Sequence, residues 1–411
     1  MRETKELKKI KGITLIALVI TIIILLILSG ITITSLTNAG LLTNTKEAKQ
    51  KSKDAQEEEH ETLESYLAQM NAITFSNVDK TKTNPEAAIP KDATVVEGDA
   101  NKGIVIKDSN DNEWVWIEVP KSIYKEKTTE TDYEGIYNAL DTYATEYRKG
   151  SDKQIDSKTT DEWYEGCGID SSKEYTEMYN RMLTSVYTNG GFWISRYEIG
   201  DSKATESNKT RVSNEVGIAV SKQNQIPYNY VICSEAQELA SKMSNDTSKK
   251  SSLLFGIQWD LVCKFLEEKT NLSIYDLKSN SATWGNYKDT SLILNIGKYN
   301  IAPGNSKSIW NFYDVNTDNY VENSSTSNDE NYKQLLTTGA SEQTNKMNIY
   351  DFAGNEWEWT LEHVTNSNTY HCIARGGGFD NKATDNPATY RLGNVVKRTN
   401  HYAFGFRTTI Y

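Results

Sequence analysis

NIYDFAGNEWEWT, residues 348–360, is the stretch that predicts most about the fold of this 411-residue chain. Its second half alternates polar and aromatic side chains with the period of a β-strand, so we expect Trp357 and Trp359 to point into a core. Gly354 precedes this alternation, where a turn with positive φ favours glycine. The stretch therefore predicts a turn followed by a core strand.

Two short motifs follow the same stretch toward the C-terminus. They are RGGGF at residues 375–379 and GFR at residues 405–407. The three consecutive glycines allow two backbones to approach closely. Arg407 follows an apolar Gly-Phe pair, so we expect its guanidinium to pair with a core carboxylate such as that of Glu358.

Four segments toward the N-terminus have the pattern of regular elements. They are the strands 113–120 (EWVWIEVP) and 190–200 (GGFWISRYEIG) and the helices 234–240 (SEAQELA) and 258–266 (QWDLVCKFL). Ser234 is expected to cap the first helix. The charged stretch 125–180 has weak periodicity and predicts a long surface insertion with some helix, whereas 316–332 is polar and predicts a mobile loop.

In motif order and spacing the chain resembles the formylglycine-generating-enzyme (sulfatase-modifying-factor) family. The likeness spans roughly residues 103–411 and rests on the motifs above together with QIPYNYVICSEAQELA at 225–240 and TTGA at 337–340. Members of that family share an elaborated C-type-lectin-like fold. The resemblance thus implies an α+β protein whose globular head is formylglycine-generating-enzyme-like. The sequence before the head predicts a long N-terminal transmembrane helix and stalk.

The resemblance also bears on catalysis. The enzyme of this family holds copper with a pair of cysteines between its Arg-Gly-Gly and Gly-Phe-Arg motifs. In this chain the corresponding segment, residues 379–404, contains no cysteine, so a thiolate-bound metal cannot form within it. The histidine cluster of the related iron-dependent sulfoxide synthases is not found in this sequence either. We therefore expect a non-catalytic protein with no catalytic residue.

The cysteines leave a competing hypothesis open, that of an exported metal-dependent enzyme of the same family. Cys372 and His371 lie just before the RGGGF motif, where a copper or iron site could form with Cys233 or Cys263. These three cysteines and Cys167 lie far apart with no CxxC motif. In an exported chain they form up to two disulfides or remain as small buried core residues, and the sequence does not choose between these outcomes.

The C-terminal segment predicts a surface that binds a protein or glycan ligand. Residues 373–411 carry six basic side chains against two acidic ones, mixed with asparagine and aromatic residues that suit recognition loops. The candidate ligand-binding residues are Asp380, Asn381, Lys382, Asp385, Asn386, Tyr390, Arg391, Asn394, Lys397, Arg398, Asn400, His401 and Tyr402. The segment looks like the diversifiable region of lectin-fold proteins rewritten by retroelements. A solvated polar loop without a ligand is the alternative.

The resemblance implies one candidate metal site, for calcium. In family members that bind calcium, the Asn of the Gly-Asn-x-Trp-Glu-Trp turn and an acidic residue shortly after it are ligands. Asn355 and Glu362 stand at those positions, and oxygen ligands suit calcium. A calcium-free turn is the alternative, so no cofactor other than calcium is expected.

The N-terminus predicts a membrane anchor. Lys11 and Lys46 bracket 34 residues without a charge, which is long enough to cross a bilayer at about 20 residues per span. The leader before it carries five basic and two acidic side chains, which favours a cytoplasmic N-terminus and an extracellular head.

The net charge of the whole chain is −11, which argues against nucleic acid as a partner.

The junction of leader and apolar run resembles the processing site of type IV prepilins. Cleavage by a prepilin peptidase would fall between Gly12 and Ile13, and the freed helix would lie in the membrane and pack with other pilins. Ala17 stands where pilins usually carry Glu, so we expect a minor, pilus-associated or pilin-like protein at the cell surface rather than a bulk fibre subunit. An uncleaved signal anchor is the alternative.

These patterns divide the chain into four parts. They are a basic leader (1–12), a pilin-like transmembrane helix and helical stalk (13–73), a polar linker (74–102) and the lectin-like head (103–411). Within the second part, residues 46–70 are rich in helix formers and free of glycine and proline, which predicts a continuous helix there.

Overall fold

The computed structural model divides the chain into two units, Met1–Tyr66 and Leu67–Tyr411. The structure describes residues 49–56, 58–59, 62, 65, 78–79, 81–153, 159–204, 217–301, 309–312, 321–322, 334–365, 372–395 and 401–411. All described residues of the first unit are helical, in agreement with the helix expected over 46–70. Among the described residues no helix has the length and apolarity needed to cross a membrane. The predicted leader, cleavage site and apolar span lie outside the described residues.

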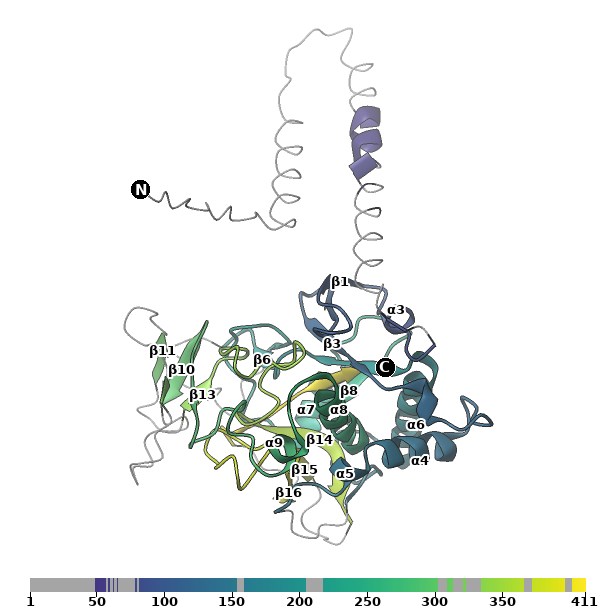
Figure 1. The fold of residues 1–411 in the computed structure, drawn as a ribbon. Helices are drawn as coiled ribbons and strands as arrows, with labels where there is room; N and C mark the ends of the chain where they lie inside the picture. Colours follow the sequence, from purple (N-terminus) through teal and green to yellow (C-terminus); the bar gives the residue numbers. More distant parts are fainter. Residues whose placement is uncertain are drawn as a thin grey trace, which may run out of the picture. The chain divides into compact units, whose positions relative to one another are not determined.

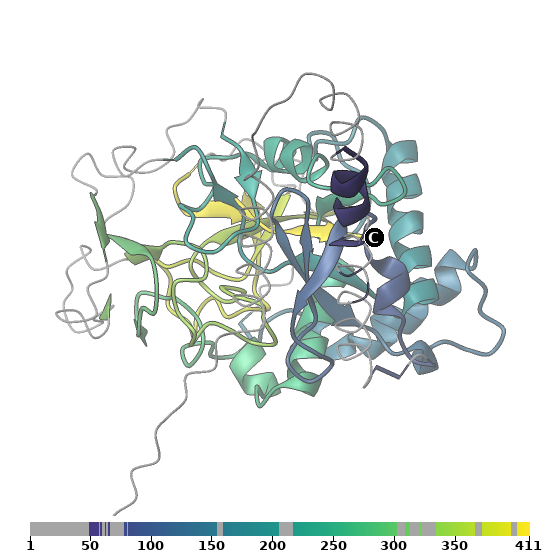
Figure 2. The same cartoon turned by 90° about the horizontal axis from the view of Figure 1, so that it is seen from above.

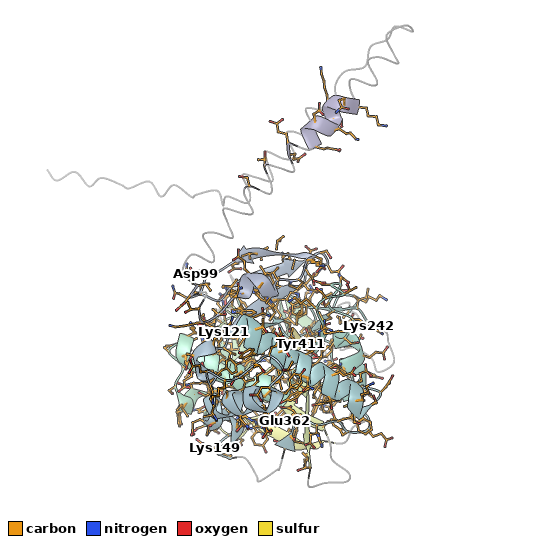
Figure 3. All side chains as sticks on the ribbon, turned by 90° about the vertical axis from the view of Figure 1, so that its right-hand side faces the viewer. Asp99, Lys121, Lys149, Lys242, Glu362 and Tyr411 are labelled. Atoms are coloured by element: carbon orange, nitrogen blue, oxygen red, sulfur yellow. The ribbon has the colours of Figure 1, made fainter. Side chains whose placement is uncertain are left out.

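The second unit, here called the head, is built on an antiparallel sheet of six strands. In spatial order these are β1 (Ala93–Glu97), β2 (Val105–Asp108), β3 (Glu113–Glu118), β5 (Gly191–Ser195), β18 (Thr408–Ile410) and β8 (Ser251–Leu253). Strands β3 and β5 confirm the two strands expected from the sequence. The last strand of the chain inserts between β5 and β8, so the terminal residue Tyr411 lies among the side chains of the head (Figure 3).

A second sheet contains the sequence motifs from which we predicted the fold. Its order is β16 (Arg391–Val395), β15 (Cys372–Arg375), β14 (Trp357–Val364) and β17 (Phe404–Phe406), with β4 (Thr159–Thr160) also paired to β14. Strands β14 and β17 run parallel, while the other pairs are antiparallel. All eight residues of β14 are buried. Trp357 and Trp359 therefore lie inside as expected, but the strand is covered on both faces.

Helices surround the two sheets. They are α3 (Pro85–Ala88), the 3-10 turn η1 (Lys121–Ile123), α4 (Tyr133–Tyr143), α5 (Thr145–Arg148), α6 (Ser172–Asn189), α7 (Cys233–Ala240), α8 (Gly256–Lys269) and α9 (Ile274–Lys278). Helix α8 confirms the helix expected over 258–266 and is buried along most of its length. Figures 1 and 2 place α4 and α6 at one end of the head and strands β10, β11 and β13 at the other.

The remaining strands form three small antiparallel sheets. These are β11 (Ile309–Phe312), β10 (Lys298–Ile301) and β13 (Gln334–Leu336) in one, β12 (Val321–Glu322) with β9 (Ser291–Leu292) in the second, and β6 (Gly200–Asp201) with β7 (Ala219–Val220) in the third. Of the loop expected over 316–332, the structure describes only the two residues of β12. That prediction otherwise lies outside the described residues.

Three sequence predictions differ from the structure. Residues 125–180 form α4, α5 and the first half of α6, in agreement with the helix expected there, but they are not a surface insertion, because Leu140 and Tyr175 are buried in the core. The expected linker 74–102 contains α3 and β1, and Val95 of β1 is buried against the main sheet. Helix α7 begins one residue before Ser234, and the Glu235 carboxylate accepts the Ile232 N–H at its start. In each case tertiary burial of a few apolar residues outweighs a polar local composition.

Candidate functional site

The turn that leads into β14 is held by the side chain of Asn355. Gly354 has φ +76° and Asn355 has φ +56°, which confirms the left-handed turn expected at the glycine. Asn355 Oδ1 accepts hydrogen bonds of 2.9 Å from Asn286 Nδ2 and from the backbone N–H of Leu336. Its Nδ2 donates to the buried Glu198 carboxylate at 2.5 Å. The amide is thus fully engaged by the protein.

Arg407 of the closing GFR motif ties the two large sheets together. Its Nε and Nη2 atoms donate to the carboxylate of Glu358 on β14 over 3.0–3.3 Å, as predicted. Nη1 donates to the Ser195 carbonyl of β5 at 2.9 Å, and Nη2 to the Tyr350 carbonyl at 2.7 Å. Both ionic partners are buried. The role of Arg407 is therefore structural.

Glu356 brings a second carboxyl to the same region. Gly405 lies against it, since a Cβ atom at that glycine would stand 2.0 Å from Glu356 Oε2. The Asn229 side chain faces the carboxyl, but neither carboxyl oxygen accepts a well-formed hydrogen bond from the described residues. Burial, followed by the charge of Glu358, raises the pKa of Glu356 well above its usual value. The GFR glycine is thus needed to accommodate this side chain.

Arg391, expected on the ligand-binding surface, is instead buried in an ionic network. Its Nη2 donates to Asp260 of α8 at 2.6 Å, and its Nε donates to Glu362 of β14 at 2.7 Å. Arg375 makes a parallel pair of bonds to the same two carboxylates, at 2.6 and 2.7 Å. Arg148 of α5 adds a bond of 2.7 Å to Asp260. A buried carboxylate requires such partners, so Arg391 is drawn away from the surface.

The environment of Glu362 does not fit the expected calcium site. Burial raises the pKa of its carboxyl, but Arg391, Arg375 and Arg148 outweigh burial and hold that pKa well below the usual range. The two carboxylate oxygens of Glu362 accept hydrogen bonds from the guanidinium groups of Arg375 and Arg391. The positive charges of these groups disfavour the binding of calcium at the same carboxylate. Asn355 belongs to the separate Glu198 network. Within the described parts of the chain, no group of three or more His, Cys, Asp or Glu can hold a metal ion.

Aromatic rings gather where the loop after RGGGF meets the segment before β17, and we call these residues the aromatic cluster. Its members are Tyr230, Trp357, Phe379, Tyr390, His401, Tyr402 and Phe404. The His401 and Tyr402 rings lie 3.8 Å apart between centroids, and the Trp357 and Tyr390 rings lie 5.9 Å apart. Trp357 is buried, whereas Tyr390, His401 and Tyr402 remain partly exposed. The cluster thus presents ring surface to solvent over an apolar base.

Polar groups from the predicted set lie next to these rings. Asp380 is close enough that its charge raises the pKa of His401, although burial has the larger effect and lowers that pKa overall. Asp380 Oδ1 is buried and accepts no hydrogen bond from the described residues. Asn381 Oδ1 instead accepts the Gly378 N–H at 3.1 Å, which shapes the loop. Asp380 as a residue is partly exposed, so an acidic side chain lies at the surface beside these rings, although its Oδ1 atom is enclosed.

The other predicted ligand-binding residues fall into two groups. Lys382 and Asp385 are exposed, Asn386 is partly exposed, and Asp385 pairs with Lys153 at 2.7 Å. Lys397, Arg398 and Asn400 lie outside the described residues, as does the side chain of Asn394. Sequence reasoning missed Tyr230, whose ring lies 6.5 Å from that of Tyr402 and whose φ is +53°. The repeated tyrosines of PYNY, residues 227–230, were the available signal.

All four cysteines are free and buried. Cys233 and Cys372 approach each other beside β14, whereas Cys263 lies next to Asp260 in the ionic network. His371, the expected partner of a metal-binding Cys372, lies outside the described residues. The structure therefore brings together one of the two cysteine pairs that the competing enzyme hypothesis considered.

Comparisons with known proteins agree with the head's motifs. Residues 117–410 match the model of a family described as the Sulfatase-modifying factor enzyme 1-like domain. No curated protein matches the chain. Among solved structures, the chain is similar to Treponema denticola variable protein 1, with a TM-score of 0.29 and 12% sequence identity. That match covers 54% of this chain and 84% of the other.

Proposed function

The chain belongs to the sulfatase-modifying factor enzyme 1-like family, and from this premise we propose that it is a non-catalytic, surface-displayed protein that binds a protein or glycan ligand. The binding surface is the exposed part of the aromatic cluster with the polar residues around it. The N-terminal pilin-like helix anchors the protein in the cell membrane or assembles it with other pilins.

One observation carries the non-catalytic part of the proposal. The segment in which the family resemblance implies a copper-binding thiol pair, residues 379–404, contains no cysteine. The thiols that the chain does contain are buried elsewhere in the head. The same segment supplies Tyr390, His401 and Tyr402, whose rings pack on Trp357, Phe404 and Phe379. In this proposal the segment lacks the reactive thiols and supplies side chains suited to binding.

The chemistry of the aromatic cluster supports a ligand with both apolar faces and hydroxyl or amide groups. Tyrosine rings offer a large contact area at a low cost in side-chain entropy. The rings of Tyr390 and Tyr402 already contact those of Trp357 and Phe379, in edge-on and tilted arrangements, and this contact reduces the side-chain entropy that remains to be lost on binding. Asp380 and the neighbouring asparagines supply hydrogen-bonding groups. Such a surface fits a glycan or a polar protein epitope.

A quadruple variant tests the proposed surface in the full-length chain. Replacing Tyr390, Lys397, Asn400 and Tyr402 by alanine should abolish binding to a glycan array and to intact cells. The melting temperature should remain nearly unchanged, because Tyr390 and Tyr402 are partly exposed and belong to neither buried ionic network. Tryptophan fluorescence reports that temperature for the head alone, since all nine tryptophans lie within it.

A matched variant controls for the number and type of residues removed. It replaces two tyrosines, a lysine and an asparagine elsewhere on the head, namely Tyr133, Tyr275, Lys242 and Asn138. This control should bind as the wild-type protein does. Equal binding by the quadruple variant would exclude the proposed surface, and a wild-type protein that binds neither probe would exclude the adhesin role.

A further inference from the structure

Two cysteines far apart in the sequence meet against the same strand. Cys233 is the first residue of α7 and Cys372 is the first residue of β15. The sulfur of Cys233 lies 3.7 Å from the Thr360 carbonyl of β14. The Thr360 hydroxyl donates to the Ile373 carbonyl, next to Cys372, at 3.0 Å. Both cysteines are therefore fixed at one point of β14 by regular elements.

The two sulfurs share a closed environment. The Tyr164 hydroxyl lies 3.2 Å from the Cys233 sulfur and also within hydrogen-bonding reach of the Cys372 sulfur. The two sulfurs are within hydrogen-bonding reach of each other. Both cysteine side chains are 0% exposed. The thiols thus face each other in a site closed to solvent.

The other two cysteines are placed differently. Cys167 directs its sulfur to the Ile169 carbonyl at 3.9 Å. Cys263 lies on α8 among the charged groups of Asp260, Arg375 and Arg391. The positions of Cys167 and Cys263 therefore differ from those of Cys233 and Cys372, whose sulfurs contact each other. Of the possible disulfide pairings among the four cysteines, the geometry favours that of Cys233 with Cys372.

We propose that Cys233 and Cys372 form a disulfide when the chain folds in an oxidising compartment. The oxidant is a second disulfide, either of a small thiol or of a dithiol oxidoreductase. The thiolate of one cysteine attacks that disulfide and releases one thiol, and the other cysteine then displaces the second thiol. The chain loses two electrons and two protons, and the oxidant is reduced to two thiols.

Burial determines when this reaction occurs. A disulfide reagent cannot reach thiols that are fully enclosed, so the bond forms before α7 packs on β14 or during local opening. Once formed, the bond links residues 233 and 372 and removes conformational freedom from a long loop of the unfolded chain. The same enclosure then protects the bond from reducing agents.

The test uses the full-length chain produced in two bacterial hosts, one with a reducing cytoplasm and one whose cytoplasm permits disulfide formation. Protein with a cooperative tryptophan-fluorescence melt is denatured, alkylated, digested and analysed by mass spectrometry. In the oxidising host we expect a cross-linked peptide that joins Cys233 to Cys372, with Cys167 and Cys263 alkylated. The oxidised form should melt about 5 °C higher than the reduced form.

Two variants sharpen the result. Cys263→Ala should retain the cross-link, because that thiol lies in the other network, and Cys372→Ala should lose it. Four alkylated cysteines in folded protein from the oxidising host would overturn the proposal. A cross-link between any other pair would overturn it equally, and the wild-type measurement decides the matter even if a variant fails to fold.

Discussion

Arginines outnumber carboxylates in one ionic network of the head, and carboxyl groups outnumber arginines in the other. Around Asp260 and Glu362, three arginines face the carboxylates at 2.6–2.7 Å. Near Arg407, three carboxyl groups are buried, those of Glu358, Glu356 and Glu198. The guanidinium donates to Glu358, and burial raises the pKa of all three groups. The pKa of Glu358 rises to about 7. The second network therefore retains protons at a pH where exposed carboxyls are ionised.

Glu356→Gln tests this consequence through the pH dependence of stability. A carboxyl with a raised folded-state pKa stabilises the fold fully below its unfolded value, near 4.5, and loses that contribution as pH rises through the folded value. Gln mimics the protonated side chain. As pH rises above about 5, the wild-type free energy of unfolding should fall more steeply than that of the variant, because only the wild-type side chain can ionise.

Denaturant titrations of the full-length chain, followed by tryptophan fluorescence, supply the comparison. Glu362 does not obscure it, because its lowered pKa keeps that carboxylate ionised throughout this pH window. Parallel pH profiles for the two proteins would show that Glu356 is already ionised in the folded head.

At the scale of elements, β14 organises the head. It pairs with β15, β17 and β4, and it carries Glu358 of one ionic network and Glu362 of the other. Its entry turn is equally constrained, since a Cβ atom at Gly354 would lie 2.2 Å from the Asn286 carbonyl oxygen. The position of the strand therefore depends on a residue without a side chain.

Gly354→Ala should destabilise the head by about 3 kcal/mol or more. The added methyl group meets the Asn286 backbone, and alanine also disfavours a φ of +76°. Chemical denaturation monitored by tryptophan fluorescence measures the loss.

Gly376→Ala is the matched control for backbone strain. Gly376 also has positive φ, but the nearest atoms to its Cβ position lie at 3.3–3.4 Å, so the control carries the strain with little steric conflict. It should cost about 1 kcal/mol. Equal decreases in the free energy of unfolding for the two variants would mean that the contact with Asn286 does not contribute to the destabilisation.

At the scale of the whole molecule, a head of the sulfatase-modifying factor enzyme 1-like family follows an N-terminal sequence that resembles type IV prepilins. The described residues of the head include the aromatic cluster of the proposed binding surface and both buried ionic networks. The proposed anchor rests on the sequence of residues 1–45, where the basic leader and the uncharged run adjoin. Processing at this junction distinguishes a pilus-associated protein from a simple membrane protein.

We predict cleavage between Gly12 and Ile13 in cells that contain a prepilin peptidase. N-terminal sequencing of protein extracted from membranes should then begin at Ile13, and Gly12→Trp should block the processing. Cleavage removes a leader of net charge +3 and exposes an apolar amino terminus for helix packing. A chain that still begins at Met1 in those cells would leave only an uncleaved signal anchor.

Local sequence patterns determined much of the head by themselves. The alternation in residues 113–120 and 357–360 and the apolar stripe of 258–266 specify strand and helix through contacts that recur every two or every three to four residues. The pairing of Arg407 with Glu358 and the left-handed turn at Gly354 were likewise predictable. Each follows from a strong local constraint, namely a buried cation that needs an anion and a backbone that excludes a Cβ atom.

Tertiary structure alone decided which polar residues remain available at the surface. Arg391 and Tyr390 are neighbours in sequence, yet Arg391 is buried against Asp260 and Glu362 while Tyr390 stays partly exposed on Trp357. Cys233 and Cys372 likewise meet only because α7 and β15 pack on the same strand. Contacts between residues more than a hundred positions apart leave no periodic signal in the chain. Their partners are selected by the packing of whole elements and by the free-energy cost of burying an unpaired charge.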